Sequence, residues 1–148
     1  MMKKRNILII LALLLVASGS VLAGNDKVIS AEELPAAALE VIKTHFPDKT
    51  IAVAKVETGI TERNYDVVFI SGEKLEFDRK GNWTEVDCRK GAVPAYFIPT
   101  EIAEFVSTYY YGVKIVKIEK EDRGEYEVDL SNGIELTFNK KFKLIDID

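Results

Sequence analysis

The chain has 148 residues, of which 30% are charged and 47% hydrophobic, with a single cysteine and a single histidine. This length allows one domain with a substantial core, and one cysteine excludes an intrachain disulfide. One cysteine and one histidine also cannot complete a closed zinc site. We therefore expect a fold stabilised by packing, with no metal and no cofactor.

Residues 1–23 have the order of a secretory signal peptide. Three basic residues within the first five precede an apolar run over residues 7–17, and small residues then lead to Ala23. The run is shorter than the ~20 residues of a spanning helix, although an uncleaved anchor is the alternative. Gly24 stands where a lipid-anchored protein would need cysteine. We predict cleavage after Ala23 and a soluble periplasmic or secreted product, residues 24–148.

The predicted mature chain is acidic. Removing the signal leaves 17 basic and 24 acidic residues, a net charge of −7. Such a surface repels nucleic acid and anionic lipid headgroups. We expect neither nucleic acid nor a membrane as a partner once the signal is cleaved.

The chain contains an internal repeat, which we take as residues 30–88 and 98–148, joined by 89–97. The first part matches at an offset of 64 residues, and after a loop three residues shorter the offset becomes 61. The matching pairs include Leu34 with Ile98, Phe46 with Tyr110, Tyr65 with Tyr126, Gly72 with Gly133, Phe77 with Phe138 and Val86 with Ile147.

Each copy predicts one helix followed by four strands. Ser30 with Glu33 resembles a capping box and Pro47 stops the first helix, whereas Pro99 starts the second and Gly112 stops it. The strands are expected at 51–56, 65–70, 74–78, 83–88, 113–118, 126–130, 134–138 and 142–147. Short connections require antiparallel pairing. The fold class is α+β, two tandem repeats with one helix packed on a four-stranded antiparallel sheet in each.

Aromatic residues recur at helical spacing, and we expect them to pack on the sheets. In the second helix the stripe includes Phe105, Tyr109 and Tyr110, with a ligand box at Tyr109 to Tyr111 as the alternative. In the joining segment, Tyr96 and Phe97 are too apolar for a free linker. We expect both to dock against the neighbouring repeat.

Several short motifs, most of them present in both copies, together resemble a known family. The helix starts are Leu34-Pro35 and Ile98-Pro99, and the first paired strands are Tyr65-Asp66-Val67 and Tyr126-Glu127-Val128. The next strands are Leu75-Glu76-Phe77-Asp78 and Leu136-Thr137-Phe138, and Gly81 and Val93-Pro94 complete the set. Their duplicated order resembles the PepSY-like, β-lactamase-inhibitor-protein-like secreted proteins. The resemblance covers nearly the whole mature chain. It implies helices laid on antiparallel sheets that can form one extended concave surface. It implies no known activity, although inhibition has been proposed for related modules.

The sequence offers little catalytic chemistry. A Ser-His-Asp or Cys-His arrangement would require His45 to meet Ser71 or Cys88, and no nucleophile motif supports this. The alternation of Val86 and Cys88 instead indicates a buried core thiol, with a reactive thiol as the alternative. We predict that the protein is not an enzyme and has no catalytic residues.

Acidic residues alternate on the last strand of each copy. They are Glu85 and Asp87, then Asp146 and Asp148. A calcium site is conceivable, but the spacing lacks the acidic loop of an EF-hand. We interpret them as the solvated face of half-buried strands.

The two copies differ on the face that should point away from the helices. Val68, Ile70 and Trp83 are expected there, beside the acidic residues Asp66, Glu76 and Glu85. At the positions of Val68, Ile70 and Trp83 the second copy carries Asp129, Ser131 and Leu144. An exposed tryptophan among aliphatic residues with an acidic rim is typical of a protein-binding site. Val68, Ile70 and Trp83 are the candidate binding residues, and the alternative is that Trp83 covers the seam between the repeats.

These observations favour an exported, non-catalytic protein-binding module. Inhibition of a periplasmic or extracellular enzyme is one function that such a module can have. The partner itself is not identified by the sequence. The alternative function is a periplasmic carrier or sensor of a small molecule or peptide, which needs a concave pocket.

Overall fold

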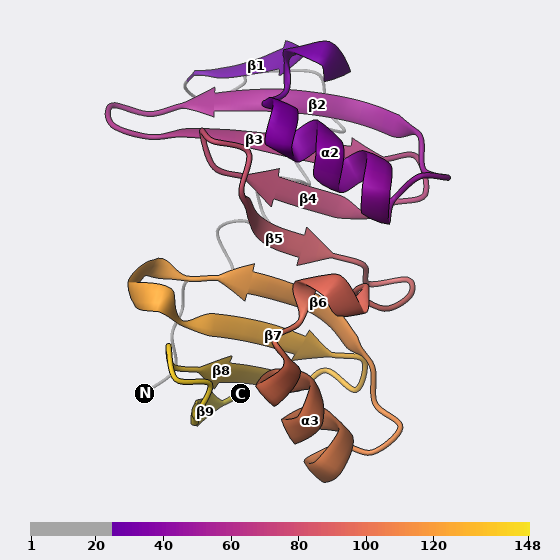
Figure 1. Ribbon diagram of the computed structural model, residues 1–148, viewed down its shortest axis with the longest axis vertical. Helices are drawn as coiled ribbons and strands as arrows, with labels where there is room; N and C mark the ends of the chain where they lie inside the picture. Colours follow the sequence, from indigo (N-terminus) through magenta and orange to yellow (C-terminus); the bar gives the residue numbers. More distant parts are fainter. Residues whose placement is uncertain (1–24) are drawn as a thin grey trace.

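The computed structural model describes residues 25–148, so the predicted signal peptide lies outside the described residues. These residues form a nine-stranded antiparallel sheet, in which every strand pairs with its neighbours in sequence, and two α-helices (Figure 1). The strands are β1 (Asp26–Ile29), β2 (Ile51–Thr58), β3 (Arg63–Phe69), β4 (Lys74–Phe77), β5 (Trp83–Asp87), β6 (Ile115–Lys120), β7 (Tyr126–Leu130), β8 (Glu135–Phe138) and β9 (Leu144–Ile147). The helices are α2 (Ala36–His45) and α3 (Thr100–Tyr109), and the 3-10 turns are η2 (Ala31–Glu33), η3 (Ala95–Phe97) and η4 (Asp122–Gly124). The predicted α+β class is confirmed.

Both α-helices lie on the same face of the sheet (Figure 1). Each helix buries an apolar stripe, because a helix this short is stable only when it packs on another element. At the C-terminal end of α2, the ring of Phe46 stacks on Phe69, with 5.3 Å between centroids. From α3, Phe105 meets Phe138 edge to face at 5.3 Å. We call the opposite side of the sheet, behind the ribbon in Figure 1, the rear face.

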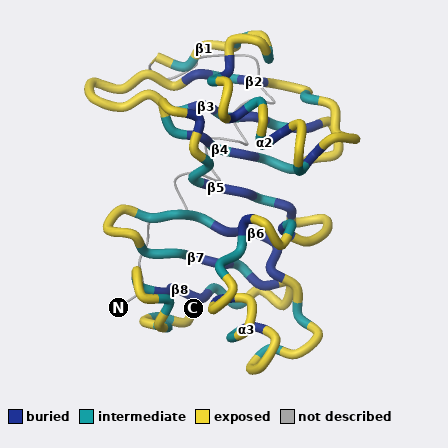
Figure 2. The backbone as a smooth tube through the Cα atoms, viewed as in Figure 1, coloured by how far each residue is buried: buried dark blue, intermediate teal, exposed yellow. Residues whose placement is uncertain are grey.

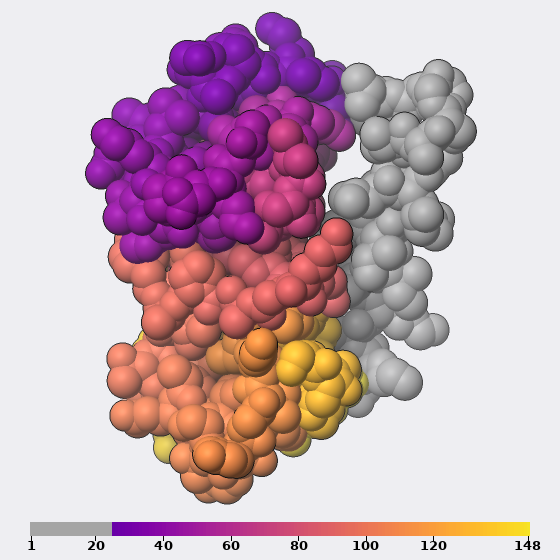
Figure 3. Space-filling model, turned by 90° about the vertical axis from the view of Figure 1, so that its right-hand side faces the viewer, coloured from indigo at the N-terminus to yellow at the C-terminus, as the bar shows by residue number. Residues whose placement is uncertain are grey.

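The two repeats share one sheet because β5 pairs antiparallel with β6, Val86 lying opposite Ile118. The eight predicted strands all form, with ends displaced by up to two residues. Strand β1 was not predicted. It covers the outer edge of β2, as β5 covers β6, so each repeat uses a preceding strand as its neighbour. Along the long axis of the molecule the repeats follow the sequence order (Figure 3).

The repeat extends to irregularities of the sheet. Register shifts leave an extra residue at Ala52 between β2 and β3, and at Val116 between β6 and β7. Two further shifts leave Thr84 unpaired beside β4 and Ile145 unpaired beside β8. These positions are related by the same offsets of 64 and 61 residues. Because a bulge reverses which residues face each side, the repeats share their pattern of faces as well as their strands.

The segment before each helix is a 3-10 turn. The capping interaction predicted for the first helix belongs to η2, where the N–H of Ser30 donates to Glu33 Oε2 at 2.8 Å. Pro35 then precedes α2, and Pro99 precedes α3. In the second copy Phe97 takes the position of Glu33, and its side chain is 1% exposed. The expected docking of Phe97 is confirmed.

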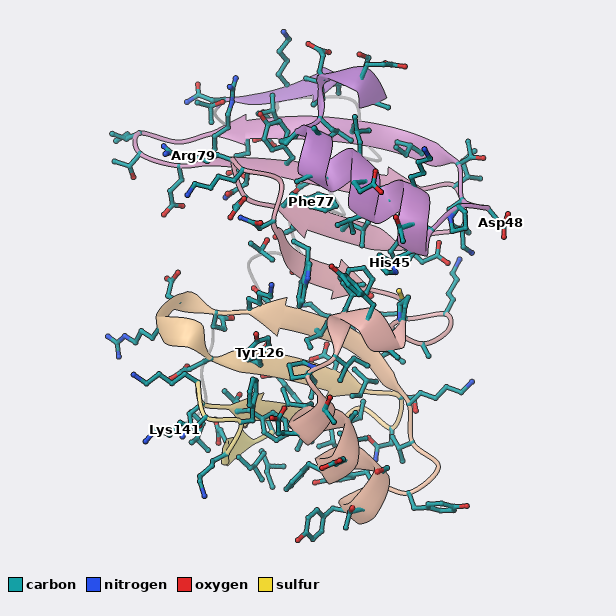
Figure 4. The ribbon with its side chains drawn as sticks, in the orientation of Figure 1. His45, Asp48, Phe77, Arg79, Tyr126 and Lys141 are labelled. Carbon is teal, nitrogen blue, oxygen red and sulfur yellow. The ribbon has the colours of Figure 1, made fainter. Side chains whose placement is uncertain are left out.

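The buried apolar side chains of both repeats form one cluster, the core. In Figure 2 the buried positions are concentrated along the strands. The fully buried large side chains of the core include Phe77, which lies under α2 (Figure 4). Cys88 belongs to this core as a free, buried cysteine, as expected. Tyr109 does not belong to the core: it is 70% exposed, contrary to the prediction, and its ring contacts that of Phe105 at 4.7 Å.

Candidate functional site

Trp83 points to a different face from the one predicted. Counting by two from Glu85 places Trp83 on the rear face, but the bulge at Thr84 sets Trp83 opposite Phe77, a core residue on the helix side. Its ring meets Phe97 edge to face at 5.4 Å, and Lys120 Nζ lies 3.6 Å from the ring centroid. The orientation predicted for Trp83 is therefore wrong. Its contacts with Phe97 and Lys120 are those expected under the alternative, in which Trp83 covers the seam between the repeats.

An apolar patch on the rear face belongs to the first repeat. Val68 lies between Val53 on β2 and Lys74 on β4, so these three side chains share the rear face. Ile70 continues the alternation one residue past β3, where its N–H donates to the carbonyl oxygen of Thr50 at 2.9 Å, and its side chain is 72% exposed. We name Val53, Val68 and Ile70 the apolar patch. In the second repeat the same three positions hold Lys117, Asp129 and Ser131.

Beside the patch, five carboxylates cross the sheet in one rank. Cross-strand pairing places Asp66 opposite Glu76, Glu76 opposite Glu85, Glu85 opposite Glu119, and Glu119 opposite Glu127. The rank spans β3 to β7 and passes through the junction between the repeats. Directly opposed like charges destabilise a sheet. This acidic rank is therefore an arrangement that packing alone does not explain.

Cations in the next rank offset part of this charge. Lys74 Nζ lies 2.6 Å from Glu76 Oε1, and Lys117 Nζ lies 3.2 Å from Glu119 Oε2 and 3.6 Å from Glu85 Oε2. Lys117 and Glu85 are both buried. Breaking a buried ion pair is costly, since the remaining charge loses its partner.

Arg89 ties the repeats together from the joining segment. Its guanidinium contacts Asp87 Oδ2 at 3.1 Å and Asp129 Oδ2 at 2.8 Å, so it reaches across β6 from β5 to β7. These contacts raise the pKa of Arg89 against the opposing effect of its partial burial. Arg89 therefore remains a cation that stabilises the junction on the rear face.

Three members of the rank, Asp66, Glu85 and Glu119, have raised pKa values. Burial, followed by repulsion from Glu76, raises the pKa of Glu85 to about 7 even though Lys117 opposes the shift. Burial also raises the pKa of Asp66 to about 6, and that of Glu119 above its ordinary value. The pKa of Lys117 is raised by Glu85 and Glu119 despite its burial. The pKa values of Glu85 and Lys117 are both raised because carboxylates outnumber cations in this part of the sheet. The acids therefore retain protons, whereas the lysine stays charged.

Two groups of acidic side chains among the described residues could present oxygens to a cation. Glu119, Glu121 and Glu127 form one, and Glu127, Asp129 and Glu135 form the other, each with ligand atoms within 4.8 Å of one another. Calcium takes six to eight oxygen ligands, so either group would supply only part of a coordination shell.

Potential catalytic side chains are engaged in packing. His45, at the end of α2, stacks on Tyr96 with centroids 3.8 Å apart and meets Phe97 at 5.3 Å (Figure 4). Burial raises the pKa of the Cys88 thiol to about 11, so little thiolate forms at neutral pH. His45 thus packs against the joining segment at the seam, and Cys88 packs in the core.

Sequence reasoning found Val68, Ile70 and three members of the acidic rank, but it missed the rank itself. Its members were visible only as single acidic positions on separate strands. Their alignment depends on the pairing of β5 with β6, which carries the rank from Glu85 to Glu119. Val53 was also missed, although alternation along β2 could have indicated it.

Comparison with known proteins identifies the family to which the chain belongs. The family model described as "Putative beta-lactamase-inhibitor-like, PepSY-like" matches residues 63–146. The search of the curated proteins found no match. Because the family model spans more than half of the chain, the chain belongs to this PepSY-like family. The resemblance found in the sequence is confirmed.

Three similar solved structures come from Bacteroides. A "putative periplasmic protein from DUF2874 family" of Bacteroides vulgatus ATCC 8482 is 50% identical, with a TM-score of 0.81, over 85% of this chain and 98% of that one. A "putative calcium-regulated periplasmic protein" of Bacteroides thetaiotaomicron is 47% identical, with a TM-score of 0.79, over 83% and 96%. A "putative periplasmic protein of unknown function" of Bacteroides vulgatus ATCC 8482 is 37% identical, with a TM-score of 0.79, over 84% and 99%.

All three relatives are described as periplasmic proteins, in agreement with the predicted periplasmic or secreted location. No helix among residues 25–148 is long and apolar enough to cross a membrane. The family comprises periplasmic proteins that are not known as enzymes.

Proposed function

We propose that this protein is an exported, non-catalytic protein-binding module that docks its partner on the rear face of the first repeat. The observation that carries the proposal is the apolar patch beside the acidic rank, on a face that neither α2 nor α3 covers. Exposed aliphatic side chains bordered by charge are typical of a protein-binding surface. The second repeat carries polar residues at the same positions, so sheet structure does not require the patch.

Charge complementarity indicates the kind of partner. Asp66, Glu76 and their neighbours in the rank face the same side as the patch, and the predicted mature chain has a net charge of −7. A partner with an apolar contact surrounded by lysine or arginine would match both features. Inhibition of a periplasmic enzyme is the consequence of binding that the family name suggests.

Capture of partners from periplasmic extract by residues 24–148 tests the proposal. The variant Ile70→Ser with Val68→Thr removes apolar surface from the patch, and Tyr109→Ser removes a similarly exposed side chain from α3 as a matched control. A basic partner should be lost with the patch variant, retained with the control, and released by salt. A partner bound equally by all three forms, and indifferent to salt, would refute this surface as the site. Activity of a captured enzyme, measured with and without the module, tests inhibition.

Trp83→Ala distinguishes the other candidate location. Because Trp83 faces the helix side, its removal should leave a rear-face partner bound. Loss of the partner with Trp83→Ala in a variant that remains folded would instead place the site on the seam.

Calcium enters the same assay as a second variable, since one relative is described as calcium-regulated. The two acidic groups on β6 to β8 are where a cation would compete with a basic partner. Partner release by calcium chloride, but not by sodium chloride of equal ionic strength, would support calcium control of binding. Equal release by both salts would exclude it.

A further inference from the structure

A hollow of about 460 Å³ opens in the first repeat where the β2–β3 loop lies beside the β4–β5 turn, on the helix side of the sheet. Its volume falls in the range of small-molecule sites. Figure 4 shows Arg79 near the hairpin of β2 and β3. The lining residues are Thr58, Gly59, Ile60, Thr61, Glu62, Arg63, Tyr65, Arg79 and Lys80. None of them belongs to the apolar patch or the acidic rank.

The lining is cationic in an acidic protein. The lining includes three cations, Arg63, Arg79 and Lys80, and one carboxylate, that of Glu62, so it carries a net positive charge. Within residues 25–148, no ion pair shorter than 4.0 Å engages any of these three cations. The nearest carboxylate in the sequence to Arg79, that of Asp78, accepts hydrogen bonds from the backbone of Lys80 and Asn82 and from the Asn82 side chain. Here two guanidinium groups and an ammonium group remain available to an external anion.

The remaining lining suits a polyatomic oxyanion with an organic body. Guanidinium groups bind phosphate, sulfate and carboxylate through paired N–H donors, and the hydroxyl groups of Thr58 and Thr61 can donate further hydrogen bonds. Tyr65 is buried beneath, whereas Ile60 is fully exposed at the rim. An apolar side chain at the rim could cover the body of a bound molecule.

The second repeat has the same turn without this arrangement. Lys140 and Lys141 replace Arg79 and Lys80, but the preceding loop is three residues shorter, and a Cβ at Gly124 would lie 3.2 Å from Lys140 Cβ. Phe142 replaces Gly81, and its ring packs on Tyr126 at 5.6 Å. In the first repeat the loop is three residues longer and glycine stands at position 81, so neither contact has a counterpart in the lining of the hollow.

We propose that the hollow binds a small molecule through its oxyanion group, with Arg63, Arg79 and Lys80 holding the anion. The site is distinct from the rear-face surface, and neither proposal depends on the other. Specificity between phosphate, sulfate and carboxylate follows from how the two guanidinium groups are spaced when the ligand is bound.

Titration of isotope-labelled residues 24–148, followed by amide chemical shifts, tests this site. The probes are inorganic phosphate, inorganic sulfate, acetate and phenyl phosphate, with sodium chloride at matched ionic strength as the reference. We expect saturable shifts of amides 58–63 and 79–81 with at least one oxyanion. Phenyl phosphate should bind at least as tightly as inorganic phosphate, since the hollow has room for its ring; weaker binding would overturn the small-molecule part of the proposal.

Matched variants assign the effect to the cations. Arg63→Gln with Arg79→Gln should weaken binding at least tenfold, and both residues are exposed, so folding should be retained. Lys140→Gln, at the equivalent position of the second repeat, should leave binding unchanged. Shifts that merely follow ionic strength, or that survive the double variant, would overturn the proposal.

Discussion

The two repeats have the same strands, helices and bulges but present different chemistry. On the rear face, the positions of Val53 and Val68 in the first repeat hold Lys117 and Asp129 in the second. At the 3-10 turns, the exposed Glu33 of the first corresponds to the buried Phe97 of the second. The shared features are those that close the core, whereas the differing ones lie on the surface or at the junction. Duplication thus provided one scaffold on which two surfaces could diverge.

The largest expected effect concerns the seam. Phe97→Ala should lower the free energy of unfolding by about 4 kcal/mol, because it leaves a cavity among Phe46, Trp83 and Tyr96. Urea unfolding measures the loss. Tyr96→Ala is the control, since Tyr96 is 62% exposed and should cost about 1 kcal/mol. Equal losses in the two variants would contradict the role of Phe97 as the residue that joins the repeats.

Lys117→Val gives the second repeat the residue of the first. It removes the cation between Glu85 and Glu119, and should destabilise the protein by about 3 kcal/mol at pH 8. The loss should be smaller at pH 5, where Glu85 is protonated. The reciprocal change Val53→Lys should alter stability by less than about 0.5 kcal/mol. A pH-independent loss for Lys117→Val would indicate lost packing in place of lost charge pairing.

Gly81→Ala tests why the two turns differ. Gly81 has φ +84°, and an added Cβ would lie 2.8 Å from the backbone nitrogen of Ala38 and 2.9 Å from Pro35 Cβ. We expect a loss of about 2 kcal/mol or more by thermal or urea unfolding, from strain together with displacement of α2. Gly133→Ala shares the positive φ but meets open space, and should cost about 1 kcal/mol. Similar losses at both sites would show that close approach of α2 is unimportant.

The smallest effect concerns pH. The pKa of Glu85 is raised in the folded state to about 7 from 4.5, so its protonated form favours folding. This stabilisation is fully present below pH 4.5 and is lost as pH rises through about 7. Between pH 5 and pH 8 the wild type should therefore lose about 2 kcal/mol of stability from this group.

The variant Glu85→Gln isolates that contribution. Urea unfolding at pH 5 and pH 8 should show a smaller difference for Glu85→Gln than for the wild type. Glu101→Gln, on the exposed side of α3, should behave as the wild type does. An unchanged pH dependence in Glu85→Gln would mean that the acidic rank carries no strained charge at this position. Asp66, whose pKa is raised to about 6, would contribute in the same direction.

The sequence by itself determined the fold class and most of the elements. Apolar periodicity, proline and glycine signals, and the duplication predicted both helices and eight strands, because each of these signals acts over a few neighbouring residues. The alternation along β3 also predicted that Val68 and Ile70 share the face opposite the helices, because residues two apart on a regular strand share a face. The edge strand β1 was not predicted, because its four residues carry too short a pattern and it is stabilised by pairing with β2.

Only the tertiary structure decided the rest. The bulge at Thr84 turned Trp83 toward Phe97, and the pairing of β5 with β6 aligned Glu85 with Glu119 to make one acidic rank. Likewise, the hollow depends on a loop and a turn that lie far apart in the sequence, at residues 58–63 and 79–80. Each of these depends on which strands meet and in what register. Local patterns do not encode register across a long connection, because it is chosen by the packing of the whole sheet against its helices.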